Sequence, residues 1–102
     1  GAKKMGERIK KDQNQIKEIK DVKEGDIIWW ESGEHIEIVV GKYDEKTETL
    51  ECMGAHSNGA YAIKRTIKKK ESFMSEEEPK GKVSFYRMKI LPEINNCSTQ
   101  EE

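Results

Sequence analysis

The chain has 102 residues, which is enough for one domain with a single hydrophobic core. Its 19 basic and 20 acidic residues give a formal net charge of -1, so it lacks the basic surplus on which charge-driven nucleic-acid binding depends. It contains no apolar run near the roughly 18 residues that span a bilayer, so no membrane span is expected, and it shows no signal peptide.

The first 24 residues predict helix. They are polar and lysine-rich, and their apolar residues recur at roughly helical spacing. This pattern indicates one or two short amphipathic helices with a break at residues 12–14. The apolar residues concerned are Met5, Ile9, Ile16 and Ile19.

Strands are predicted after a turn at residues 23–26. Residues 27–30, Ile-Ile-Trp-Trp, form a β-branched and aromatic run typical of a buried strand. Alternation predicts that one tryptophan is in the core and that the other lies on the opposite face. Residues 35–40 form the next strand, with Ile36, Ile38 and Val40 on one face and His35, Glu37 and Val39 on the other.

A hairpin loop at residues 41–46 leads to a returning strand, residues 47–53, which we expect to pair with residues 35–40. Leu50 and Cys52 share the apolar face of this returning strand, and Cys52 is expected to be a small buried hydrophobe. Residues 61–67 and 83–91 predict two more strands, and the charged segment 68–82 predicts a long exposed loop.

These elements predict an α+β fold, in which a small curled antiparallel sheet or barrel carries an N-terminal helix. Residues 1–92 are expected to form one domain, and residues 93–102 a flexible tail.

The most informative segment begins at Gly25-Asp26, continues through the apolar strand, and reaches His35 at the head of the next strand, which ends in Gly41. An imidazole at the end of a rigid strand suits a general base. This arrangement resembles the NlpC and CHAP superfamily of papain-like cysteine hydrolases, many of which cut peptide bonds in bacterial cell walls. The resemblance covers residues 21–53 well and the last strand loosely.

The resemblance implies that His35 is the catalytic base and that Glu51 orients its ring. A four-residue loop at 44–47 would place Val40 opposite Glu51 and His56 opposite His35, so His56 competes for that role. Trp30 and His56 are the candidate substrate-binding residues.

The family's nucleophilic cysteine precedes the Gly-Asp strand, but this sequence has no cysteine before Cys52. One interpretation is that the segment carrying the nucleophile is missing from this chain and that the chain alone is inactive. A second is a permuted hydrolase that uses Cys97, and a third is a non-catalytic binding module with the same barrel. The two cysteines have no metal-type spacing, so no metal or cofactor is expected.

The resemblance therefore implies the histidine-bearing part of a cysteine amidase or endopeptidase, with peptide or peptidoglycan substrates and an extracellular or cell-wall location. The missing N-terminal segment is a further possible partner, and nucleic acid is not expected as one.

Overall fold

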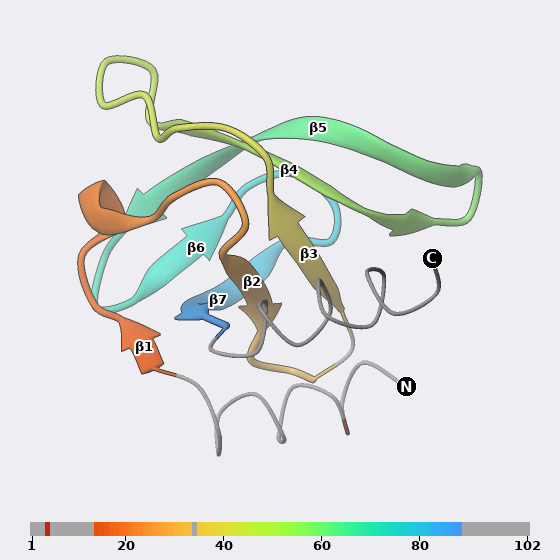
Figure 1. Cartoon of the computed structure of the whole chain (residues 1–102), viewed down its shortest axis with the longest axis horizontal. Helices are drawn as coiled ribbons and strands as arrows, with labels where there is room; N and C mark the ends of the chain where they lie inside the picture. The colour runs from red at the N-terminus through yellow and green to blue at the C-terminus, as the bar shows by residue number, and fades with distance from the viewer. Residues whose placement is uncertain (1–3, 5–13, 34, 89–102) are drawn as a thin grey trace, which may run out of the picture.

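The computed structural model describes residue 4 and residues 14–33 and 35–88 (Figure 1). The regular secondary structure of residues 14–33 and 35–88 is all strand apart from one short 3-10 helix. Consecutive strands from β2 to β7 pair antiparallel with one another, and β7 returns to pair with β2. The result is a closed six-stranded barrel. The elements are β1 (Asn14–Ile16), the 3-10 helix η1 (Ile19–Asp21), β2 (Ile27–Trp30), β3 (Ile36–Val39), β4 (Thr49–His56), β5 (Gly59–Lys69), β6 (Phe73–Ser75) and β7 (Gly81–Arg87).

The seventh strand, β1, lies outside the ring of six. It pairs with residues 85–87 of β7, on the edge whose other half, residues 81–83, pairs with β6. Both edges of β7 are therefore hydrogen-bonded, which leaves no open edge at the closure of the barrel. The β4–β5 hairpin extends beyond the body of the barrel (Figure 1).

The predicted α+β class is wrong, because no α-helix element lies within residues 14–33 and 35–88. Residues 14–24, expected to be helical, form β1 and the single turn η1. A helix this short is marginal by itself, whereas pairing with β7 satisfies the backbone of β1 and buries Ile16. The earlier part of the predicted helix, residues 1–13, lies outside the described residues except for residue 4.

The predicted loop at residues 68–82 is also wrong in part. β5 continues to Lys69, and β6 occupies residues 73–75 with Phe73 and Ser75 buried. The many charged residues of this segment conceal the period of two that places Phe73 and Ser75 on the inner face.

The barrel interior holds the main hydrophobic core, in which Leu50 and Cys52 are buried as predicted. Trp30 belongs to this core, whereas Trp29 belongs to a second cluster with Ile27 and Tyr86, so the two tryptophans lie on opposite faces of β2. Both are buried. The described residues contain no helix with the length and hydropathy that a membrane-spanning helix needs.

The predicted alternation of β3 is observed, but the face that carries Glu37 points into the barrel. Glu37 is 1% exposed, whereas Ile38 is 50% exposed on the outer surface. A carboxylate in this position needs partners inside the barrel.

Candidate functional site

The strand register brings two histidines together at one end of the barrel. Ile38 pairs with Met53 and Val39 with Cys52, and continuing this register places Glu37 opposite Gly54 and His35 opposite His56. The bond from Val40 N–H to Glu51 O agrees with the register predicted from sequence. The connecting turn differs, because it closes at the Asp44–Thr49 bridge.

Gly54 provides the space in which the Glu37 side chain lies. A Cβ atom at residue 54 would be 2.5 Å from Glu37 Cγ and 3.1 Å from its Cδ. The Glu37 carboxylate is held among other groups and cannot simply swing away, so this position requires a residue without a side chain.

The buried Glu37 carboxylate is paired with Arg65 of β5, which is itself inaccessible to solvent. Arg65 Nε donates to Glu37 Oε1 at 2.7 Å, and one terminal nitrogen donates to Glu37 Oε2 at 2.8 Å. The remaining N–H groups donate to Ser75 Oγ and to the carbonyl oxygens of Glu77 and Glu78 at 2.9–3.0 Å. All five donors of the guanidinium are therefore satisfied inside the barrel.

Trp30 packs against this ion pair. The centre of the Arg65 guanidinium lies 4.6 Å from the centroid of the Trp30 ring, a cation–π contact. The indole N–H of Trp30 donates to the carbonyl oxygen of Pro79 at 2.7 Å, which fixes the plane of the ring. Trp30 thus helps to shield the ion pair from solvent.

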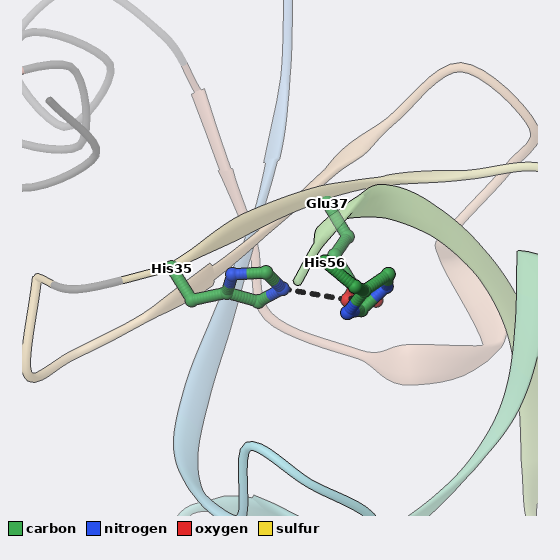
Figure 2. Close-up of side chains that lie close together, drawn as sticks. All are labelled: His35, Glu37 and His56. Carbon is green, nitrogen blue, oxygen red and sulfur yellow. Dashed lines mark hydrogen bonds and ion pairs between the residues drawn. The ribbon is translucent and has the colours of Figure 1, made fainter. Parts of the chain in front are cut away.

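His35 points toward the Glu37 carboxylate (Figure 2), and His56 lies close to the same oxygen atom. His35 Nε2 lies 2.6 Å from Glu37 Oε2 in a hydrogen bond. His56 Nε2 lies 3.3 Å from the same oxygen but makes no hydrogen bond with any described residue. The side chains of His35 and His56 are 18% and 12% exposed, so both are within reach of solvent at the barrel end.

Two opposing effects act on the pKa of Glu37. Burial by itself raises the pKa of Glu37. The hydrogen bonds and positive charge of Arg65, together with the hydrogen bond from His35, lower the pKa by a larger amount, so the net shift is downward. Glu37 is therefore ionised at neutral pH and can only accept hydrogen bonds. The proton in the contact with His35 consequently lies on His35 Nε2, which leaves the lone pair of the neutral ring on Nδ1.

Of the site residues predicted from sequence, the structure brings Trp30, His35 and His56 together and places Glu51 elsewhere. The ring of Trp30 lies edge-on to that of His35, with centroids 4.8 Å apart, and the His56 ring lies 5.4 Å from that of His35. Glu51, the predicted orienting residue, is exposed beside Gly41 and is not part of this cluster. The carboxylate beside His35 is that of Glu37.

Sequence reasoning assigned no role to Glu37, Arg65 or Gly54. The alternation in His35-Ile36-Glu37 places the carboxylate on the same face as the imidazole, and this signal could have identified Glu37. Arg65 had no comparable local signal, because its contact with Glu37 joins strands 28 residues apart in the chain.

Cys52 is unsuited to act as a nucleophile. Burial, with a smaller contribution from the negative charge of Glu37, raises the pKa of its thiol to about 12. Cys52 is the only cysteine within residues 14–33 and 35–88, and Cys97 lies outside the described residues.

Comparison of the chain with protein-family models, with curated proteins and with solved structures finds no match. The resemblance to the NlpC and CHAP superfamily therefore stays a prediction, and a functional argument has to rest on the side chains at the barrel end.

Proposed function

We propose that the barrel end is a general-base site in which His35 removes a proton from a nucleophile while Glu37 holds its ring. The hydrogen bond of 2.6 Å between His35 Nε2 and the buried Glu37 carboxylate carries this proposal. A histidine held by a carboxylate is the base-and-orienter part of a catalytic relay, in which a third group supplies the attacking atom.

The chemistry follows from the position of the protons. Because Glu37 accepts the Nε2 proton, Nδ1 of His35 is the atom that receives a proton from the nucleophile. The imidazolium that results is stabilised by the negative charge of Glu37. Arg65 keeps that carboxylate ionised and in place, so it is a positioning residue rather than a catalytic one.

The proposed reaction is hydrolysis of amide bonds in cell-wall peptides, as the resemblance implies. The nucleophile in that family is a thiolate, and Cys52 is excluded by its burial and raised pKa. The thiol must therefore come from outside the described residues. Cys97 is one such thiol, and a chain in which neither Cys97 nor another thiol reaches His35 should be nearly inactive.

A binding module is the second candidate function. It is favoured by the aromatic surface beside the histidines, where the Tyr61 ring lies 4.5 Å from that of His56 and Tyr61 is 42% exposed. Exposed aromatic rings can bind a ligand by packing against it, with no catalytic step.

The test measures hydrolysis of peptidoglycan peptides by the natural gene product and by the 102-residue chain with and without Cys97→Ser. In an active gene product, His35→Ala should reduce turnover at least about 10³-fold, and Glu37→Gln by about 10²–10⁴-fold. Glu51→Gln, a matched change on the outer face, should have little effect.

Activity that survives His35→Ala would contradict the proposal. Activity of the 102-residue chain that disappears with Cys97→Ser would identify the permuted hydrolase. Peptide binding by an inactive gene product would favour the binding module.

A further inference from the structure

The same end of the barrel presents a second chemical possibility, because its donor set is one that metal ions use. His35, Glu37 and His56 each offer one ligand atom, and these atoms all lie within 4.8 Å of one another. Two imidazole nitrogens and one carboxylate oxygen are ligands of zinc and of other first-row transition metals. We propose that these three residues bind a divalent transition-metal ion.

The distances are close to those that a metal ion requires. Zinc bonds of about 2.0–2.2 Å in tetrahedral geometry separate two ligand atoms by roughly 3.4 Å. His56 Nε2 and Glu37 Oε2 are already 3.3 Å apart. His35 Nε2 is 2.6 Å from that oxygen, and all three ligand atoms lie within 4.8 Å of one another, so binding requires the two rings to shift by about 1 Å.

His56 provides an independent observation. Its Nε2 atom is buried, lies 3.3 Å from the Glu37 carboxylate, and has no hydrogen-bond partner among the residues that the structure describes. A buried polar atom without a partner is costly, and such atoms are rare in proteins. A metal ion between the two rings would satisfy this nitrogen.

The surroundings of Glu37 favour binding and also limit which metals can bind. Arg65 contacts both carboxylate oxygens and fixes their orientation, as groups behind a metal ligand commonly do. Its positive charge also offsets the negative charge of Glu37, so the attraction for a cation rests on the two imidazoles. Zn²⁺, Co²⁺ or Ni²⁺ should therefore bind in preference to Mg²⁺ or Ca²⁺, which require several oxygen ligands.

Metal binding and the proposed base function exclude one another at His35. A metal ion on Nε2 displaces the proton from that atom, and in the neutral ring the proton then resides on Nδ1. Because Nδ1 is the atom proposed to act as the base, the metal-bound protein should be inhibited. The expectation of no metal relied on cysteine spacing, which is uninformative about a site made by histidines on neighbouring strands.

The experiment titrates metal-free protein carrying Cys97→Ser, which removes the thiol outside the described residues. Zn²⁺ binding is measured by calorimetry, and the histidine rings are followed by ¹⁵N NMR. We expect one Zn²⁺ per chain, coordination shifts at Nε2 of both rings, and no comparable response to Mg²⁺. His35→Ala and His56→Ala should each weaken binding by about 100-fold or more, whereas Glu51→Gln should leave it unchanged.

Circular dichroism of each variant separates loss of the site from loss of the fold, and His56→Gln is a second variant should His56→Ala unfold. Absence of Zn²⁺ binding at millimolar concentration, or undiminished binding by the folded double variant His35→Ala/His56→Ala, would overturn the metal site. Neither result affects the activity measured with His35→Ala, so the metal site and the base function can fail separately.

Discussion

Residues 14–33 and 35–88 contain two arginine–carboxylate pairs of similar geometry in different surroundings. Arg65 and Glu37 meet inside the barrel through two hydrogen bonds, and both side chains are 0% exposed. Arg87 and Asp26 also meet through two hydrogen bonds, each 3.0 Å long, but the Arg87 side chain is 45% exposed. The same chemical pair therefore occurs once without solvent and once at the surface.

The difference shows what each pair does. The outer pair fastens the turn before β2 to the end of β7, since Asp26 also accepts from Lys23 N–H and Arg87 also donates to Asp21 O. The inner pair has a large desolvation cost, and burial of such a pair is weak evidence for stability. The inner pair differs from the outer pair in that its carboxylate contacts two histidines. We therefore infer that the inner pair serves to position the site residues.

The largest effect should follow from removing one partner of the inner pair. Glu37→Leu or Arg65→Met alone leaves an unpaired buried charge and should lower the free energy of unfolding by about 3–5 kcal/mol. The double variant should lose far less than the sum of the two, and can equal the original stability. Urea unfolding of all four proteins measures this coupling, and additive losses would show that the inner pair does not act as a unit.

A smaller effect should follow from filling the space beside Glu37. Gly54→Ala should lower the free energy of unfolding by about 1–3 kcal/mol, because the new Cβ overlaps Glu37 Cγ. The control is Gly41→Ala, where the nearest atom, Glu51 Cβ, is 3.3 Å away on an exposed side chain. A Gly54→Ala protein as stable as the control would mean that the Glu37 side chain is not held as described.

The pH dependence of stability tests whether water is excluded from the barrel interior around Cys52. Its pKa is raised from 9.0 to about 12 in the folded protein, so the neutral thiol contributes stability below pH 9 that is lost as the pH rises toward 12. Between pH 9 and 10, unfolding free energy should fall by up to about 1.4 kcal/mol. Both proteins compared carry Cys97→Ser, and one of them also carries Cys52→Ala. The decrease should be absent in the Cys52→Ala protein. An equal dependence of unfolding free energy on pH in the two proteins would mean that solvent reaches the Cys52 thiol.

The smallest effect should follow from breaking the outer pair. Arg87→Met should lower the free energy of unfolding by no more than about 1 kcal/mol, because the exposed guanidinium is well solvated when unpaired. The loss should shrink further in 1 M salt, since salt screens exposed charges. A loss equal to that of Arg65→Met, measured by the same urea unfolding, would remove the contrast between the two pairs.

The sequence was most informative where neighbouring strands form the structure. The pairing of residues 35–40 with 47–53 and the alignment of His35 with His56 follow from local alternation and from a short connection. The helix predicted within residues 14–24 failed because the pairing of β1 with residues 85–87 is invisible locally. Glu51 was chosen because the resemblance places the orienting residue on the strand that follows His35. The contact that makes the interior acceptable for Glu37 comes from Arg65, 28 residues away in the chain.

The closure of the barrel has a consequence for how the chain folds. From β2 to β7 each strand pairs with the next along the chain, so these contacts require only short loops to close. The pairing of Ile27 with Tyr86 joins residues 59 positions apart and has the larger entropic cost of a long loop. We expect the hairpins to nucleate early and the β2–β7 seam to form last, a sequence that φ-value analysis of Ile28 and Leu50 would test. In that order, the contact between Glu37 and Arg65 is made before the barrel closes, while water can still leave its interior.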